Sequence, residues 1–510
     1  MKHAIIACVG ALALAAGSAE AGPEDGTLNL AFTDPIEGVD PIFDPKQETD
    51  FLASAVFNRL IAYDADSRSY YGELAEDFRQ IDPLTWEFDL RSGITFHDGS
   101  AFDAEDVAYT INFIADPDQR YRLRTRFTFM QGAEVVDADT VRIHLVEPYA
   151  PALARLATSL PIFPSDAHGA LEDPSTWGQV AVGTGPYRLL SLDASDGIVL
   201  ERYEDYAVGA APEIETIRIR PIPDAQSQLA ELMVGNLDAI RVHNADMVMM
   251  AGANPDVEVT TYQSLNFLYL LLDASGESGA EQLTDPLVRQ AIFHAIDRGA
   301  IQQAIVAGGG EVEQIDRICF PSQVACPEGG EVPSFDPDLA RDLLAEAGFA
   351  DGFPIEITTI GPVRHIAEAV AGYLRDVGIV ASVDTQSMGG YRQRQQDGEI
   401  QILVQEYTHG GLPDAGYALS FYYGSPTRNS SGDPRMGEIA RSANSEADAE
   451  AREELVREGY DRMVETGLIL PISASPAVFL HSSAVTLDLE TEALLMNPYG
   501  ASALTFAWAD

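Results

Sequence analysis

Hydrophobic residues recur along this chain with two periods, one typical of strands and one typical of helices. Strict alternation of apolar and polar residues predicts strands over 85–91 (TWEFDLR), 140–146 (TVRIHLV) and 216–222 (TIRIRPI). Between such segments, apolar residues spaced three and four apart predict helices that bury one face. This alternation is typical of α/β domains, and 510 residues leave room for two or three of them.

Clear start signals precede the predicted helices. Asp224, Asp285 and Asp336 each stand just before a periodic stretch, where a side-chain oxygen can cap the first turn. A fourth helix is expected from about Arg364 to Gly378. The residues expected on the buried faces are Leu229, Leu232 and Met233; Val288, Ala291, Ile292, Ala295 and Ile296; Leu343, Leu344 and Ala347; and Ile366, Ala369, Val370, Tyr373, Leu374 and Val377.

The start of the chain has the pattern of a secretory signal peptide. A positively charged start is followed by the apolar run Ala4 to Ala16 and by Ala19-Glu20-Ala21, so cleavage is expected near Ala21. A membrane anchor is the alternative, but it needs about 20 apolar residues. Cys8 faintly resembles a lipoprotein site, yet cleavage there would leave almost no apolar core in the signal. We therefore expect a periplasmic protein.

Two cysteines follow the expected cleavage point, Cys319 and Cys326 in CFPSQVAC. An even count, a short loop and an exported location together predict a disulfide. Closing so short a loop should add only ~2–3 kcal/mol to the free energy of unfolding. Zinc is the alternative, but neither a second cysteine pair nor a nearby histidine completes four ligands.

The net charge of −49 limits the classes of partner. So acidic a surface repels phosphate backbones and anionic membranes, which excludes nucleic acid and makes a membrane surface unfavourable. The charge biases the ligand weakly toward neutral or cationic compounds. Lys46 is the only lysine after the cleavage point, and its surroundings match neither a phosphate-binding loop nor a Schiff-base site.

The stretch FHDGSAFDAED (96–106) gathers a histidine and four carboxylates, which raises the question of a metal or acid–base site. Asp98 begins a turn signal, Asp103 stands where a helix N-cap belongs, and carboxylates in a first turn favour the helix dipole. His97 alone supplies no metal-ligand spacing. We expect purely structural roles for His97, Asp98, Asp103, Glu105 and Asp106.

Seven segments resemble a known family and occur in the family's order. They are VFNRLIAYD, the stretch 70–114 that contains TWEFDLRSGITFHDGSAFDAEDVAYTINFI, VGTGPYRL, QLAELMVGNLDAI, DPLVRQAIFHAIDRGAI, FDPDLARDLLAEAGF and YLRDVGIVASV. Together they resemble the family 5 extracellular solute-binding proteins of ABC importers, which include the dipeptide, oligopeptide and nickel binders. The resemblance spans nearly the whole mature chain.

The resemblance implies an α/β, two-lobe periplasmic-binding-protein fold with hinge crossovers and a subdomain inserted in the larger lobe. Carried onto this chain, it predicts a signal peptide at 1–21 and a first lobe over 22–263, with the insertion at about 58–180. A second lobe would follow over 264–471, with a return to the first lobe over 472–510. The crossover strands would lie near 260–270 and 470–478. Closure of such lobes sequesters a ligand from water.

The resemblance also places the ligand between the lobes, against the loops 33–38, 241–246, 358–362, 387–391 and 406–411. A surface histidine is the alternative for His243, and a tyrosine that closes the end of a sheet is the alternative for stacking by Tyr407. The residues expected at the ligand are Asp34, His243, Asn244, Met388, Tyr391, Tyr407, His409 and Asp414.

One departure from the family affects the choice of ligand. Peptide binders of the family carry a tryptophan at the position of Tyr407 and, three residues later, an aspartate that holds the peptide ammonium; here that position is Gly410. An unpaired buried ammonium is costly, so a peptide needs another carboxylate, for which Asp414 is the nearest substitute. The arginine and tyrosine of the dipeptide binder's loop are also unmatched at 358–362. Opine-like compounds, metal chelates, haem and oligosaccharides therefore remain alternatives to peptides.

The expected function is that of the periplasmic solute-binding component of an ABC importer. It would capture a small-molecule solute or short peptide and deliver it to the transmembrane subunits of the permease, as a monomer and without metal or cofactor. A ligand sensor or chaperone on the same fold is the alternative. A secreted hydrolase is disfavoured, because the chain contains no G-x-S-x-G, no H-E-x-x-H and no glycine-rich phosphate loop.

Overall fold

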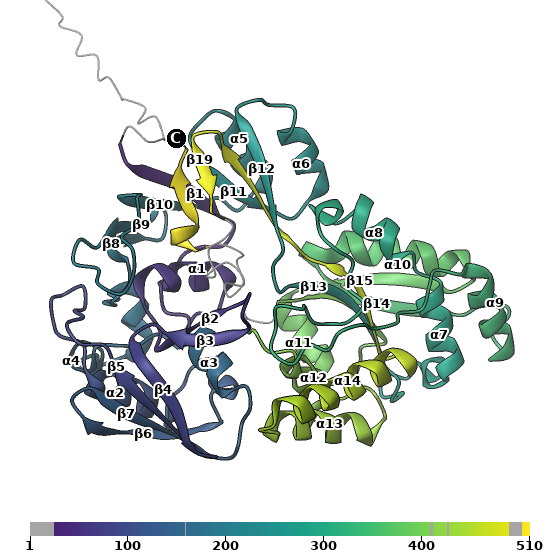
Figure 1. The fold of residues 1–510 in the computed structure, drawn as a ribbon. Helices are drawn as coiled ribbons and strands as arrows, with labels where there is room; N and C mark the ends of the chain where they lie inside the picture. The colour runs from purple at the N-terminus through teal and green to yellow at the C-terminus, as the bar shows by residue number, and fades with distance from the viewer. Residues whose placement is uncertain (1–24, 159, 409–411, 426–427, 489–501, 510) are drawn as a thin grey trace, which may run out of the picture.

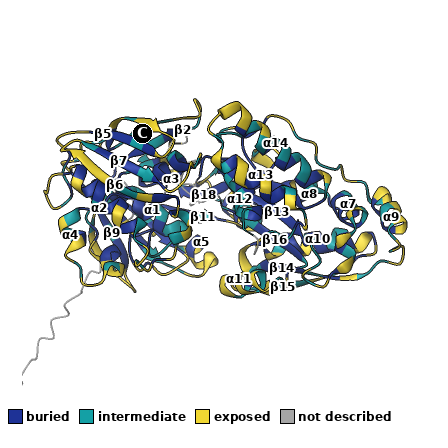
Figure 2. Ribbon diagram, turned by 90° about the horizontal axis from the view of Figure 1, so that it is seen from below, coloured by how far each residue is buried: buried dark blue, intermediate teal, exposed yellow. Residues whose placement is uncertain are grey.

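The protein consists of two lobes, each built on one large β-sheet (Figure 1). The computed structural model describes residues 25–158, 160–408, 412–425, 428–488 and 502–509. We call the part built on the seven-stranded sheet the first lobe and the part built on the five-stranded sheet the second lobe. Strands lie buried inside each lobe, and helices with exposed outer faces cover them (Figure 2).

The sheet of the first lobe is mixed. Strand β1 pairs in parallel with β10 and β11, and the outer strands pair in antiparallel fashion. The strand predicted at 216–222 is confirmed as β10. The order is β12 (Val257–Tyr262), β18 (Ala477–Ser482), β11 (Ala239–Val242), β1 (Thr27–Phe32), β10 (Thr216–Pro221), β9 (Gly197–Arg202) and β8 (Tyr187–Asp193).

A smaller antiparallel sheet packs against the same hydrophobic core as β1. It contains both other predicted strands, as β5 and β7. Its order is β4 (Ala75–Asp82), β5 (Thr85–Leu90), β7 (Thr140–Leu145) and β6 (Met130–Asp137). The hairpin β2 (Ile61–Asp64) and β3 (Ser69–Gly72) lies beside it, with the helices α1 (Gln47–Val56), α2 (Ala104–Ala115), α3 (Ala152–Thr158) and α4 (Ser165–Gly169), and the short 3-10 turns η1 (Arg124–Arg126) and η2 (Pro174–Gln179).

The sheet of the second lobe is covered on both faces, which explains why every residue of its strand β13 is buried. Leu268, Leu270 and Leu272 pack into one core, whereas Phe267, Tyr269 and Leu271 pack into the other. The order is β15 (Val380–Gln386), β14 (Pro354–Ile360), β16 (Ile402–Tyr407), β13 (Phe267–Leu272) and β17 (Ile469–Ala474).

The remaining helices divide between the lobes. In the first lobe, α5 (Ala225–Met233) and α6 (Ala245–Ala251) pack with β11, β12 and β18. In the second lobe, one face of the sheet packs with α7 (Pro286–His294), α8 (Arg298–Ala304), α9 (Pro337–Glu346) and α10 (Arg364–Asp376), and the other with α12 (Gly416–Tyr423), α13 (Pro434–Ser445) and α14 (Ala449–Glu465). Shorter elements are α11 (Met388–Gln396), η3 (Glu281–Thr284), η4 (Gly309–Glu311), η5 (Gly361–Val363), β19 (Val485–Leu487), η7 (Ala503–Thr505) and β20 (Phe506–Trp508).

The predicted helix caps are confirmed. The side chains of Asp224, Asp285 and Asp336 accept hydrogen bonds from backbone N–H groups of their first turns at 2.8, 2.9 and 2.9 Å. One buried-face prediction is wrong: Met233 is 39 % exposed, because α5 ends there and the last turn leaves the core. Ile296 lies beyond the end of α7 but is buried as expected.

Local hydrogen bonds account for the acidic stretch 96–106. Asp103 accepts from the N–H of Glu105 at 2.9 Å, and the Asp106 carboxylate accepts from the N–H of Asp103 at 3.1 Å, so the N-cap prediction is confirmed. Asp98 accepts from the N–H of Ser100 in the predicted turn. The ring nitrogens of His97 lie 2.9 Å and 3.1 Å from the backbone of Gly185 and Gly183.

The chain passes between the two large sheets twice. Residues 263–266 link β12 to β13, and residues 475 and 476 link β17 to β18. The two crossovers are joined, because the Ser264 hydroxyl donates to the carbonyl of Ser475 at 2.8 Å and the Ser475 N–H donates to the carbonyl of Asn266 at 2.9 Å. The residue limits expected for the lobes and for the insertion stay predictions.

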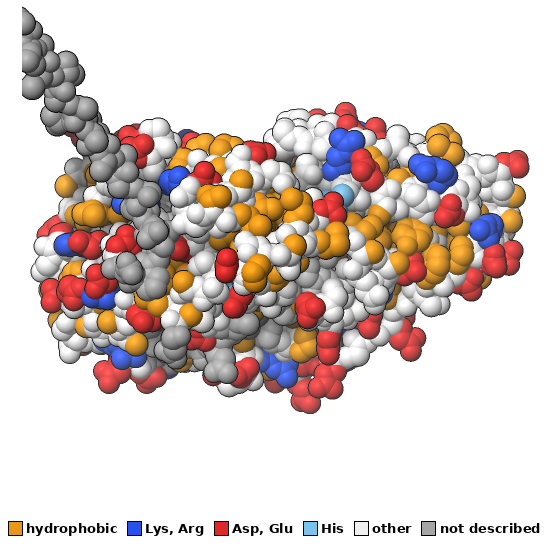
Figure 3. Space-filling view, turned by 90° about the horizontal axis from the view of Figure 1, so that it is seen from above, with side chains coloured by type: hydrophobic (Ala, Val, Ile, Leu, Met, Phe, Trp, Pro, Cys, Tyr) orange, Lys and Arg blue, Asp and Glu red, His pale blue; other side chains and the backbone are white. Residues whose placement is uncertain are grey.

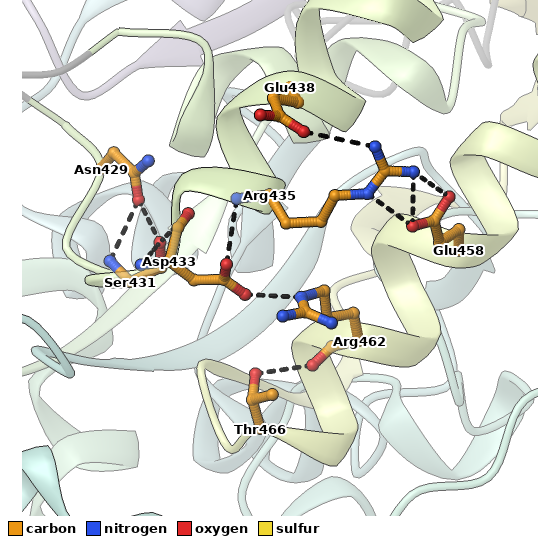
Figure 4. Close-up of polar contacts among 8 residues, drawn as sticks. All are labelled: Asn429, Ser431, Asp433, Arg435, Glu438, Glu458, Arg462 and Thr466. Atoms are coloured by element: carbon orange, nitrogen blue, oxygen red, sulfur yellow. Dashed lines mark hydrogen bonds and ion pairs between the residues drawn. The ribbon is translucent and has the colours of Figure 1, made fainter.

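Hydrogen bonds and ion pairs join the outer helices α13 and α14 of the second lobe (Figure 4). Asp433 caps α13 by accepting from the N–H of Arg435 at 3.0 Å, and it also binds the guanidinium of Arg462 on α14. Arg435 in turn donates to both oxygens of Glu458 at 2.8 and 2.7 Å.

Within the described ranges, no helix combines the length and apolar character needed to cross a membrane.

The predicted disulfide is present. Cys319 and Cys326 are bonded, with their Cα atoms 5.9 Å apart. The loop that they close touches the first lobe, because the Tyr63 hydroxyl donates to the carbonyl of Ser322 at 2.7 Å. A second contact between the lobes joins the N–H of Ala150 to the carbonyl of Asn444 at 2.7 Å. The two lobes are therefore in direct contact away from the crossovers.

Candidate ligand-binding site

The carboxyl ends of parallel strands supply the loops between the lobes. Strands β1 and β11 run parallel in the first lobe, and β14 and β16 run parallel in the second. Ligands of α/β proteins bind beyond this edge of a sheet, because the loops there converge. Asp34 follows β1, His243 follows β11, α10 begins soon after β14, and Thr408 follows β16.

Charged groups from opposite lobes lie close together beside the crossovers. Arg241 on β11 donates to the side chain of Gln47 at 2.7 Å. Glu406 on β16 accepts from the Ser475 hydroxyl at 2.6 Å. Burial raises the pKa of Glu406, while the Ser475 hydrogen bond and the positive charge of Arg241 act to lower it. Since Arg241 and Glu406 belong to different sheets, their interaction depends on the relative position of the lobes.

Two carboxylates of the first lobe, Glu48 and Asp50, lie in the first turn of α1, and Asp34 is close enough to act on Glu48. Burial raises the pKa of Glu48, and the nearby charge of Asp34 raises it further. Burial also raises the pKa of Asp50 to about 6, although Arg126 and Arg59 act to lower it. Asp34 itself is exposed. A cationic group of a ligand placed beside Asp34 and Glu48 would be stabilised by both charges.

Two histidines from different lobes, His243 and His365, lie near enough for their charges to interact. The surrounding protein lowers the pKa of His243, and the charges of Arg241 and of His365 on α10 lower it further. The imidazole of His243 is nevertheless exposed to solvent. Asn244 caps α6 by accepting from the N–H of Asp246 at 2.7 Å, so its side-chain oxygen supports the loop that carries His243.

The aromatic candidates of the second lobe lie mostly in its core. Tyr407 is 6 % exposed and packs against Phe267, Phe421 and Tyr422, with ring centroids 5.1, 5.1 and 5.6 Å away. Tyr391 is 7 % exposed, on α11. The structure therefore places Tyr407 in the core at the end of the sheet, as in the alternative to stacking on a ligand.

Met388 and Asp414 differ in their availability to a ligand. Met388 begins α11 and is 46 % exposed. Asp414 is buried and accepts two hydrogen bonds from the guanidinium of Arg452, both at 2.8 Å. A ligand ammonium at Asp414 would compete with this guanidinium. His409 and Gly410 lie outside the described residues.

Two arginines between the lobes were missed by sequence reasoning. The guanidinium carbon of Arg155, on α3, lies 4.1 Å from the ring centre of Tyr417, on α12 of the other lobe. Burial and the charge of Arg155 lower the pKa of Arg126, in η1, whereas Tyr417 and Asp50 act to raise it. The only sequence signal is that Arg155 interrupts the apolar stretch APALARLATSLP.

A family comparison decides what kind of protein carries this site. A family model for bacterial extracellular solute-binding proteins, family 5, matches residues 69–430. The chain belongs to this family. Members are non-enzymatic proteins that bind small solutes or peptides and work with ABC permeases, so this family 5 protein is an ABC-transporter solute-binding protein.

Individual relatives of the family 5 protein differ in their ligands. It is 28 % identical over 434 residues to heme-binding protein A of Haemophilus influenzae, covering 79 % of this chain and 76 % of that protein. It is 26 % identical over 442 residues to the dipeptide-binding protein of Escherichia coli, covering 80 % and 81 %.

Solved structures share its two-lobe α/β fold. The ABC transporter substrate-binding protein CtaP of Listeria monocytogenes matches with a TM-score of 0.82 at 20 % identity, over 95 % of this chain and 99 % of that one. NikA of Brucella suis, in complex with Fe(III)-EDTA, matches with a TM-score of 0.79 at 25 % identity, over 90 % and 95 %. The predicted fold class and family are confirmed.

Proposed function

We propose that this protein is the periplasmic component of an ABC importer, and that it captures a small polar solute between its lobes for delivery to the permease. The contact of Arg155 with Tyr417 across the lobes carries this proposal. Side chains that meet only when the lobes approach can make a ligand's affinity depend on closure. The signal-peptide pattern that ends near Ala21 supports the periplasmic location.

The candidate residues take different roles in this proposal. Asp34, with Glu48, holds a positive charge of the solute, because the two carboxylates lie close together beside α1. His243 and Met388 contact the solute from opposite lobes, since both are exposed beside the carboxyl ends of strands. Four residues support the residues that contact the solute: Asn244, Tyr391, Tyr407 and Asp414. His409 is kept as a candidate for contact with the solute.

The test combines binding with lobe closure. Calorimetry against dipeptides, tripeptides, glutathione, opines, sugars and metal chelates should identify a ligand of 1:1 stoichiometry, and small-angle scattering should show a more compact particle in its presence. Asp34→Asn should weaken a cationic or zwitterionic ligand by about tenfold or more. The proposal fails if no solute changes the shape of the protein. Loss of solute uptake in a deletion strain with intact signalling would separate transport from sensing.

A further inference from the structure

The loop closed by the disulfide, called the disulfide loop below, is anchored in one lobe and touches the other. Cys319 and Cys326 are 4 % and 7 % exposed and belong to a hydrophobic core of the second lobe. Between them, the Ser322 carbonyl accepts from the hydroxyl of Tyr63, on β2 of the first lobe, at 2.7 Å. Val324 packs against the hydrophobic core of the first lobe. The tip of the disulfide loop therefore bridges the two lobes.

The same loop fixes the segment that leads into α12. The N–H of Val324 donates to the carbonyl of Pro413, and the N–H of Ala415 donates to the carbonyl of Val324, both at 2.9 Å. Helix α12 begins directly after Ala415 and carries Tyr417, whose ring contacts the guanidinium of Arg155 in the first lobe. A change in the shape of the disulfide loop would therefore act on this second contact between the lobes as well.

The covalent bond restricts the disulfide loop to the shape that makes these contacts. Ala325, next to Cys326, has a φ of +58°, which lies in the left-handed region that residues with a side chain rarely adopt. A short loop closed by a disulfide also has far less conformational freedom than the same loop when open. Reduction removes this restriction, so Ala325 can leave the left-handed region, and Ser322 and Val324 lose their fixed positions.

Uncharged contacts between the lobes have a particular value in so acidic a chain. The net charge is −49, and Figure 3 shows Asp and Glu side chains spread over both lobes, with fewer Lys and Arg. Like charges on the two lobes repel each other and favour separation. The hydrogen bond of Tyr63 and the packing of Val324 involve no charged group. They therefore oppose the separation of the lobes without adding to the repulsion.

We propose that the disulfide loop is a redox-sensitive latch between the lobes. With the Cys319–Cys326 bond intact, the loop holds the lobes together, and after its reduction the lobes separate more often. The reductant is a dithiol: one thiolate attacks a sulfur of the bond, and the second thiol resolves the mixed disulfide. Two electrons and two protons pass to the two cysteines, and the reductant leaves as a disulfide. Faster release of a captured solute would follow, and only this consequence rests on the proposed function.

Hydrogen–deuterium exchange without added solute separates a latch from a bond that stabilises only its own surroundings. The native protein is compared with protein that has been reduced by dithiothreitol and alkylated, and with the variant Cys319→Ser/Cys326→Ser. In both comparisons, exchange should become about threefold faster in the hairpin β2–β3 of the first lobe, as well as in the disulfide loop. Faster exchange that is confined to the second lobe would overturn the proposal.

The rate of reduction gives a second readout, on protein in which the bond is intact. Both cysteines are buried, so dithiothreitol reaches them only when the loop detaches. Tyr63→Phe removes the hydrogen bond to the loop and should raise the rate of reduction about threefold, measured by alkylation and intact mass. The matched control is Tyr121→Phe, because the Tyr121 hydroxyl donates to the carbonyl of Ile114 within the first lobe, also at 2.7 Å. The control should be reduced at the native rate, and a native rate for Tyr63→Phe would overturn the latch.

Calorimetry connects the latch to solute capture. The probes are the dipeptides, tripeptides, opines, sugars and metal chelates named above; glutathione is omitted because its thiol exchanges with disulfides. Each probe that binds the native protein should bind the reduced and alkylated protein about tenfold more weakly. Unchanged affinity would overturn the latch and leave solute capture standing. If none of the probes binds, the proposed function is contradicted, while hydrogen exchange and the rate of reduction still decide the latch.

Discussion

The Asp414–Arg452 pair allows a sharp test of whether Asp414 supports the fold or binds the solute. Both side chains are almost fully buried, at 1 % and 4 % exposure, and two hydrogen bonds of 2.8 Å join them. Asp414→Asn removes the charge but keeps an oxygen that can accept from the N–H of Tyr417, now 3.1 Å away. The Arg452 guanidinium would then lie buried without a counter-charge. We expect the free energy of unfolding to fall by about 3–5 kcal/mol.

Urea denaturation followed by tryptophan fluorescence measures this loss, and calorimetry on the folded variant measures ligand affinity. Replacing both partners by apolar residues, Asp414→Leu with Arg452→Met, should recover most of the stability, because no charge is left unpaired. The reasoning is refuted if Asp414→Asn unfolds like the native protein. It is also refuted if the variant keeps its stability and loses more than about tenfold in affinity, since the carboxylate would then bind the solute directly.

Three further predictions follow from local contacts. Reduction of the Cys319–Cys326 bond should lower the free energy of unfolding by about 2–3 kcal/mol, and two alkylatable thiols in the unreduced protein would contradict the bond. Asp103→Ala should cost about 1 kcal/mol in urea denaturation through loss of the cap, with ligand affinity unchanged; a tenfold loss of affinity would show a binding role. Burial lowers the pKa of His168 from 6.5 to about 4. Between these two pH values the imidazole is protonated in the unfolded chain and neutral in the folded protein. Stability should therefore be lost as the pH falls from about 6.5 toward 4, and His168→Gln should flatten this slope in denaturation at a series of pH values; an unchanged slope would contradict the assignment.

Much of the fold could be predicted from the sequence because its signals are local. Strand β10 follows from the alternation in TIRIRPI, and α10 follows from a stripe of apolar residues that ends at Gly378. Asp103 could be assigned to a helix cap because the cap bond joins residues only two apart. Met233 was misplaced since periodicity does not show where a helix leaves the core.

The site could be predicted only in part, because its charges come from segments far apart in the chain. Arg155 and Tyr417 are separated by more than half of the chain, and only the packing of the lobes brings them together. The ion pair of Asp414 with Arg452, 38 residues away, likewise has no signal in the local sequence. The resemblance predicts ligand contacts in the loops after β1, β11 and β16, which stay predictions, and it gives no indication of the arginines on η1 and α3.

The distance between the lobes, measured with and without solute, tests the central claim most directly. Spin labels can be placed at Val234 in the first lobe and Val380 in the second, which are 70 % and 61 % exposed, while the native cysteines stay in their disulfide. We predict a broad distribution of long distances without ligand, and a narrow, shorter distance, equal to that of the present structure, once the tightest-binding solute is bound. Tight binding of that solute with an unchanged distribution would contradict capture between the lobes.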